Sequence, residues 1–435
     1  RQASQYYANQ SAMSNMIASI SNNKGEIKIA SEDLIKIFAN NKDRMPSPMD
    51  AILWRTAEYN KKLNGKRSIK WLPSKLTDPN YIKKARERGS EMITKDLVDF
   101  LENNPELADI SYGWYGDNYT QAKEELSNGP LPELKDPESE AYFSFLVALT
   151  SPQSDPELNT KKAIQAFIKS ERNRSDFPTG LSKSQQKTVE NYNKIKDHLG
   201  SHSEVAKFLT TKINAKDLEK KLWEYGVIEK VGTGQFKEMS DSETVYASEF
   251  LGPKVGAFYL NLMGIEDIAT IDLWMYRALS TALGEPITNI NYSKLIKLYE
   301  KSVKDGKKFN INDIKIPKYK KDGSRAMDKG KPAFESLKLI ESAGGRSRLK
   351  LYREVVEQIQ QDFNKATGKD WTVAQVQAGI WYMEKHIFTK NNVTGSKVGT
   401  SDYLSVAESI VDLGEVYDEK TRRTIRTAKE ASIER

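Results

Sequence analysis

The 435-residue chain has no cysteine and only three histidines, which limits the kinds of site it can build. Without thiols there are no disulfides, no cysteine nucleophiles and no iron–sulfur cluster held by thiolates. His198 and His202 are four positions apart, a spacing that can bind a metal on one helix face. Gly200 lies between them, however, and no third ligand is evident. We therefore expect no metal and no cofactor.

Apolar residues are also scarce, at 38% of the chain, and the mean hydropathy is −0.65. No stretch approaches the roughly 20 apolar residues of a membrane span, and no secretory signal is evident at the start. We expect a helical protein of two or three domains with much solvated surface and no membrane association. Because the first residue is Arg1, we expect a processed product or a piece of a larger chain.

Apolar side chains recur at helical spacing, whereas alternating runs of β-branched residues are short. This pattern predicts an all-α protein. Expected helices include 31–38, 139–149, 349–363, 372–388, 402–414 and 418–433. In the second of these, we expect a buried face made of Tyr142, Phe143, Phe145, Leu146 and Leu149.

Clusters of Pro and Gly suggest three consecutive regions, with boundaries near 135 and 390. Within the middle region, 301–332 holds eleven Lys and Arg residues against four Asp, a net charge of +7 that equals the charge of the whole chain. We expect a long basic insertion over about 301–335 that contacts nucleic acid through Lys318, Lys320 and Lys321, although a plain flexible loop has the same composition.

A break at Gly252 and Pro253 separates two predicted helices. Ser240 and Glu243 have the spacing of a capping box, which predicts a helix over 244–250. The helix after the break would bury Val255, Phe258, Tyr259 and Leu262 and stop at Gly264. Free backbone N–H groups at its start are suited to binding a phosphate.

Lys254 lies in the first turn of this second helix, and Asp272 follows eighteen positions later at the start of another. The helix dipole and partial burial both favour the neutral amine, which can attack an electrophilic sugar carbon. Asp272 would stabilise the cationic transition state and transfer protons. The alternatives are a solvated surface lysine and an aspartate that only caps its helix.

This layout resembles the helix-hairpin-helix DNA glycosylases, the superfamily of endonuclease III and the 8-oxoguanine DNA glycosylases. In that family a lysine and an aspartate at these places do the chemistry. Arg277, five positions after the aspartate, and Asn261, seven after the lysine, also match family positions. Phe250 stands where the hairpin usually has its first glycine, and Trp274 where a histidine often lies.

Two further blocks resemble the same family. In 145–167, Ser151, Gln153 and Asn159 match a loop whose glutamine fills the gap left by an extruded base, although an ordinary capping loop explains them equally. Residues 373–381 resemble the helix that closes the core. The resemblance covers about 138–390 and implies a two-lobed helical core with additional N- and C-terminal helices.

Two other segments have a structural and a functional interpretation. The aromatic side chains of 111–119 could stack on a nucleic-acid base. We prefer the structural interpretation, in which these rings close a hydrophobic core. Arg346 and Arg348 would meet phosphate or lie on a solvated helix start.

The resemblance implies a DNA glycosylase with AP-lyase activity that works through a lysine Schiff base. It implies that DNA is the partner and that it binds at the hairpin around Gly252. It does not identify a protein partner. The alternative is an inactive DNA-binding or structural protein that reuses the fold. Because the chain also resembles segments of large multi-domain phage proteins, we expect it in the cytoplasm or in a virion.

Overall fold

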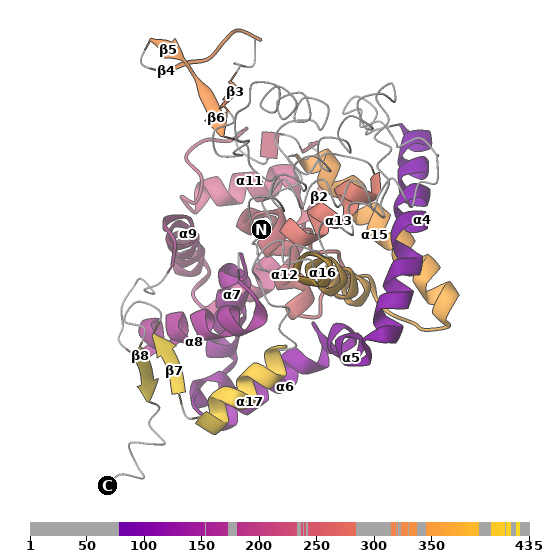
Figure 1. Cartoon of the computed structure of the whole chain (residues 1–435). Coiled ribbons are helices and arrows are strands. Elements are labelled where there is room, and N and C mark those ends of the chain that lie inside the picture. Colours follow the sequence, from indigo (N-terminus) through magenta and orange to yellow (C-terminus); the bar gives the residue numbers. More distant parts are fainter. Residues whose placement is uncertain are drawn as a thin grey trace, which may run out of the picture. The chain divides into compact units, whose positions relative to one another are not determined.

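The computed structural model describes residues 78–152, 154–172, 181–232, 236–237, 239–240, 242–283, 315–318, 320, 323–328, 330–336, 345–390, 402–413, 415–418 and 423–426. This part of the chain contains thirteen α-helices and only short strands, which confirms the predicted all-α class (Figure 1). The expected helix at 31–38 lies outside it. None of the described helices is both long and apolar enough to cross a membrane.

The chain divides into two compact units that alternate along the sequence. Unit 1 takes its described residues from 78–98, 273–283, 315–336, 345–362 and 380–390, and unit 2 takes its own from 99–272, 363–379 and 402–426. Each unit is thus assembled from several segments that are separated in the sequence.

Unit 1 contains most of α4 (Pro79–Asn103), α13 (Leu273–Leu283), most of α15 (Arg346–Thr367) and the second half of α16 (Val373–Lys390). The helices expected at 349–363 and 372–388 are thus confirmed. The Tyr352 hydroxyl hydrogen-bonds to Ser280 at 2.7 Å, and its ring packs on Tyr276 at 5.8 Å. These contacts join α13 to α15.

Unit 2 is built around α7 (Pro137–Thr150), in which every residue from Ala141 to Thr150 is buried. The expected buried face is present, but the helix is enclosed on all sides. Around it lie α8 (Pro156–Arg172), α10 (His202–Leu209) and α12 (Pro253–Leu262). Unit 2 also contains the ends of α4 and α15 and the first half of α16. Its other described elements are α5 (Pro105–Gly113), α6 (Asp117–Asn128), η2 (Pro132–Lys135), α9 (Lys183–Leu199), β1 (Lys212–Asn214), α11 (Ala215–Glu224), β2 (Thr244–Tyr246), η4 (Ala247–Leu251), α17 (Tyr403–Leu413), β7 (Glu415–Asp418) and β8 (Arg423–Arg426).

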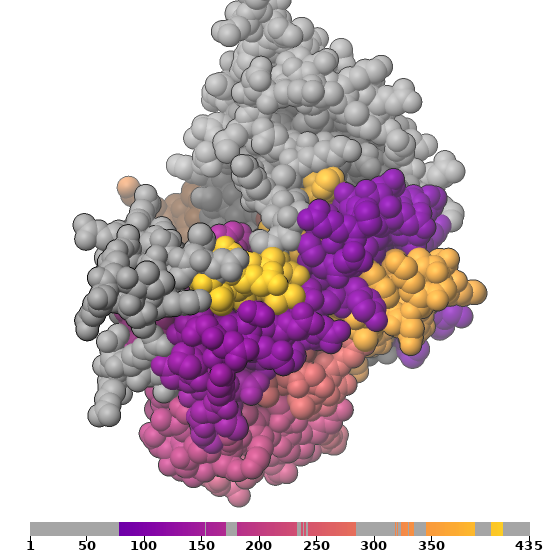
Figure 2. Space-filling model, turned by 90° about the horizontal axis from the view of Figure 1, so that it is seen from below, coloured from indigo at the N-terminus to yellow at the C-terminus, as the bar shows by residue number. Residues whose placement is uncertain are grey.

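Helix α17, the first helix expected in the tail, packs along α6 (Figure 2). The Tyr403 ring lies edge-on to the rings of Trp114 and Tyr119, at 5.9 and 5.7 Å. The carboxylate of Asp402 accepts hydrogen bonds from Ser405 N–H at 2.8 Å and from Asn118 at 2.6 Å. The aromatic segment 111–119 therefore closes a core through Trp114, Tyr115 and Tyr119, which are all buried.

The predicted helix over 244–250 is wrong. Thr244, Val245 and Tyr246 form strand β2, which pairs antiparallel with β1, and a short 3-10 helix, η4, follows. β-branched and aromatic residues favour a strand when a partner is present, and β1 supplies that partner more than thirty residues earlier. The capping-box spacing of Ser240 and Glu243, on which the helix prediction rested, contains no information on this pairing.

The second tail helix, expected at 418–433, is contradicted at the residues of this range that the structure describes, 418 and 423–426. Strands β7 and β8 form an antiparallel hairpin in which Val416 opposes Ile425 and Tyr417 opposes Thr424. In 301–332, short strands likewise replace the expected loop in the described residues: β3 (Lys315–Pro317) pairs with β6 (Phe334–Ser336), and β4 (Met327–Asp328) pairs with β5 (Lys331–Pro332).

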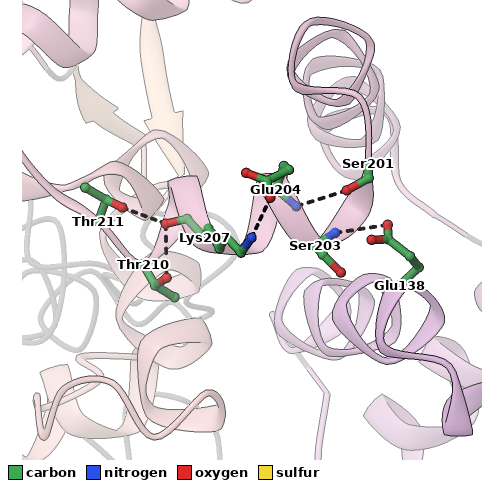
Figure 3. Close-up of polar contacts among 7 residues, drawn as sticks. All are labelled: Glu138, Ser201, Ser203, Glu204, Lys207, Thr210 and Thr211. Carbon is green, nitrogen blue, oxygen red and sulfur yellow. Dashed lines mark hydrogen bonds and ion pairs between the residues drawn. The ribbon is translucent and has the colours of Figure 1, made fainter.

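His198 and His202 lie on different helices, because α9 ends at Gly200 with a φ of 98°. The start of α10 is capped twice (Figure 3). The Ser201 hydroxyl accepts from the Glu204 N–H at 3.2 Å, and the Glu138 carboxylate accepts from the Ser203 N–H at 3.0 Å. The second cap holds α10 against α7, because Glu138 belongs to α7, the helix that ends next to Ser151.

Candidate active site around Lys254

The candidate site begins at a tight reversal between η4 and α12. Gly252 has a φ of 92° and a ψ of 160°, a conformation that only glycine adopts without strain. A Cβ on Gly256 would lie 2.5 Å from the Ser248 carbonyl oxygen, so η4 and α12 are in backbone contact there. This arrangement places Pro253 first and Lys254 second in α12.

The ammonium group of Lys254 is enclosed by protein, although the residue as a whole is partly exposed at the helix start. It donates a hydrogen bond to the carbonyl oxygen of Ser151 at 3.3 Å. Ser151 directly follows α7, and α7 packs against α12. Helix packing therefore joins two sites that are about a hundred residues apart in the sequence.

Burial lowers the pKa of Lys254 from its ordinary value, because desolvation disfavours the charged form. The negative charge of Asp272 acts in the opposite direction and raises this pKa. The two residues that the sequence paired therefore lie within electrostatic reach of each other. The net lowering increases the fraction of neutral amine at a given pH.

Asp272 lies at the end of a loop that side-chain hydrogen bonds hold at several points. The Asn261 side chain accepts from the Ile268 N–H at 3.2 Å, donates to the Ile268 carbonyl at 2.7 Å and lies 3.4 Å from the Thr270 hydroxyl. The Asp267 carboxylate accepts from the first two N–H groups of α16, both at 2.7 Å. Asn261 was singled out from the sequence, and its role here is to shape the loop before Asp272.

Tyr115 lies close to Asp272, and the sequence had suggested either that its segment stacks on a base or, as preferred, that it closes a core. Burial raises its pKa, and the nearby charge of Asp272 raises it further. Its hydroxyl donates to the Gln377 side chain at 2.7 Å, and its ring packs on Phe258 at 5.6 Å. Its place in the aromatic segment 111–119 was the available signal, but nothing in the sequence linked that segment to Asp272.

The block at 145–167 contributes Ser151 and a buried network behind it. The Ser151 hydroxyl is buried and has no hydrogen-bond partner among the described residues. The Asn159 side chain accepts from Thr150 at 2.7 Å and donates to the Tyr403 hydroxyl at 2.9 Å. Asn159 is 1% exposed, so it supports the segment around Ser151 from inside the protein.

The remaining candidates have varied positions. Gln153 and Lys321 lie outside the described residues. Arg277, in unit 1, is buried with its guanidinium 4.7 Å from the Trp274 ring centre. Of the other unit 1 candidates, Lys318 and Lys320 are exposed, and Arg346 and Arg348 are partly buried at the start of α15.

Among the described residues, no group of three or more acidic or histidine side chains is arranged to hold a metal ion. Comparison with protein-family models, with curated proteins and with solved structures found no match to this chain.

Proposed function

We propose that this protein is a DNA glycosylase with AP-lyase activity in which Lys254 is the nucleophile and Asp272 is its proton-transfer partner. The observation that carries the proposal is a lysine whose ammonium is enclosed, whose pKa is lowered by burial, and whose pKa the charge of Asp272 raises in opposition. An amine tuned in this way is suited to form a Schiff base.

The proposal includes a helix-hairpin-helix glycosylase-like fold over about 138–390. It is supported by the order of α7, the Ser151 turn, the Gly252 reversal, α12 and the start of α13 along the chain. The hairpin of this protein has a 3-10 turn in place of a full first helix. Backbone N–H groups at the start of α12 would bind a phosphate, and Gly252 lets the backbone approach it closely.

The target nucleotide would leave the base stack to reach Lys254. The neutral amine attacks C1′ and the base departs with its bonding electron pair. At an abasic site the amine adds instead to the C1′ aldehyde, and water leaves to give an iminium ion. Loss of a C2′ proton then expels the 3′ phosphate by β-elimination, and water hydrolyses the iminium to regenerate the lysine. Asp272 accepts and returns the protons.

Borohydride trapping tests the proposal. Duplex DNA with an abasic site or 8-oxoguanine is incubated with the full chain and sodium borohydride. Wild type should give a covalent adduct, and Lys254→Gln should give none. Lys220→Gln is the matched control, since Lys220 is an exposed helix lysine whose side chain is 71% accessible; it should trap like wild type. An undiminished adduct in Lys254→Gln would exclude the assignment.

A second candidate function is an inactive DNA-binding or structural protein, and the hydrogen bond from Lys254 to the Ser151 carbonyl favours it. In that role the lysine only ties α12 to the end of α7. Lys254→Met would then lower the midpoint of urea unfolding. Wild type would bind DNA in a salt-dependent way but would cut none of a panel of lesions.

A further inference from the structure

The described residues of 315–336 form a branched β-structure, here called the basic fork, which the candidate site does not use. Its stem is the β3–β6 ladder. At the branch point, the Lys318 N–H donates to Ala333, the Ala326 N–H to Lys318 and the Ala333 N–H to Ala326, at 2.8–3.1 Å. Beyond it the backbone continues as two short hairpins.

Each prong of the fork ends in a glycine-containing turn. In one, the Gly323 N–H donates to the Lys320 carbonyl at 3.0 Å, and Gly323 has a φ of 80°. In the other, Asp328 pairs with Lys331, and Gly330 between them has a φ of 76°. These backbone bonds hold the described residues of both prongs, so the side chains of those residues are presented on a defined frame.

The fork exposes cations and apolar groups together. Lys318, Lys320 and Lys331 are all exposed. Two large apolar side chains are exposed as well, Met327 at 54% and Phe334 at 50%. The Arg325 guanidinium lies 4.7 Å from the Phe334 ring centre. The fork therefore presents cations, which can bind phosphate, and exposed apolar side chains on the same backbone frame.

We propose that the basic fork is a second DNA-binding element, which holds duplex DNA through its phosphates and places Met327 against apolar sugar or base edges. Three exposed lysines complement a phosphate backbone. A two-stranded β-ribbon has the dimensions to enter the major groove, and exposed Met or Phe side chains are the groups that proteins insert at base steps. The partner is therefore duplex DNA, bound without dependence on sequence.

Fluorescence anisotropy with a labelled, undamaged duplex of about 20 base pairs tests the fork at several salt concentrations. The variant is Lys318→Gln/Lys320→Gln/Lys331→Gln in the full chain. Its matched control, Lys83→Gln/Lys187→Gln/Lys220→Gln, removes the same charge from lysines whose side chains are 75%, 60% and 71% accessible. The fork variant should lose about tenfold in affinity near 0.1 M salt, and its log–log salt slope should fall by about 2 to 3. The control should stay within about twofold of wild type.

Met327→Ser separates the apolar contact from the charges. It should weaken binding about threefold or more and leave the salt slope unchanged, because no cation is lost. Circular dichroism confirms that each variant is folded. Equal weakening by the fork variant and its control, or undiminished binding by the fork variant, would overturn the proposal. The proposal would also be overturned if, in parallel titrations, the fork variant kept its affinity for duplex DNA and lost affinity only for double-stranded RNA or for phosphatidylserine vesicles.

The inference is independent of chemistry at Lys254. Binding of undamaged duplex is compared between wild type and the fork variant without borohydride or strand cleavage, so its outcome does not depend on whether the trapping experiment succeeds. Failure of the fork and failure of the proposed activity are therefore distinguishable.

Discussion

At the scale of single residues, the protonation of Lys254 is set by two opposing effects. Burial favours the neutral amine, and the Asp272 carboxylate favours the ammonium ion. The sequence paired these residues by their spacing, but it contained no information on the degree of burial. The sign and balance of the two effects depend on how α7 and α12 pack.

Replacing Asp272 by Asn should lower the pKa of Lys254 further, because it removes the charge that raises it. The pH profile of Lys254 modification by an amine reagent, read by peptide mass spectrometry, should move to lower pH. The overall trapping rate should fall at the same time, since proton transfer is lost. An upward shift of the pH midpoint would contradict the electrostatic assignment. Asp217→Asn, at an exposed position of α11, is the control and should leave the profile unchanged.

His202 is predicted to make folding stability depend on pH. Burial is the main cause that lowers the pKa of His202 from 6.5 to about 4, and the charge of Lys196 lowers it as well. The carboxylates of Glu138 and Asp136 raise this pKa by a smaller amount. As the pH falls from 6.5 towards 4, the unfolded chain takes up a proton that the folded protein refuses. Stability should therefore decline across this window and level off below it.

The measurement is the free energy of unfolding in urea as a function of pH. The slope between pH 6.5 and 4 should be smaller in His202→Gln than in wild type. His198→Gln, at an exposed position in the last turn of α9, is the matched control and should retain the wild-type slope. Identical slopes in all three proteins would refute the His202 assignment.

At the scale of elements, the reversal before Lys254 depends on a close approach of η4 to α12. A Cβ at Gly256 would lie 2.5 Å from the Ser248 carbonyl oxygen, and a backbone atom cannot give way cheaply. Gly256→Ala should therefore destabilise the protein by about 1–3 kcal/mol. Gly116→Ala is the control, since its Cβ would meet nothing within 4 Å and its φ is −94°. A neutral Gly256→Ala in urea unfolding would show that the contact can relax.

Helices were predictable where the segment's own sequence contains a long pattern of apolar residues at helical spacing. Helices α7, α15, α16 and α17 have long apolar patterns, and all four were expected. The errors at 244–250 and 418–433 share a cause, because strands β2 and β8 lie in these segments and form by pairing with another segment. Helical hydrogen bonds are local, whereas the partner of a strand is not contained in the strand's own sequence.

At the scale of the whole molecule, unit 2 depends on contacts between segments that are far apart in the chain. The hydrogen bond from Tyr115 to Gln377 joins residues 262 positions apart, and both side chains are buried. Asp267 likewise caps α16, more than a hundred residues later. The surroundings of Asp272 therefore depend on a helix that the sequence linked to it only through a resemblance.

Gln377→Leu should destabilise the protein by about 1–3 kcal/mol, because it leaves the buried Tyr115 hydroxyl without its acceptor. The double variant Tyr115→Phe/Gln377→Leu should lose less than the sum of the single losses, since both partners are then apolar. Urea unfolding of the four proteins completes the cycle. Additive losses would show that this hydrogen bond does not couple the segments.

The sequence by itself determined the helical class, the absence of disulfides and thiolate chemistry, and the break that places Lys254 at a helix start. These properties follow from composition and from local periodicity. Only the tertiary structure decided that the Lys254 ammonium is enclosed against Ser151, that Asp272 acts on it, and that Tyr115 belongs beside them. Burial and electrostatic proximity arise from packing between distant segments, so no local pattern contains them.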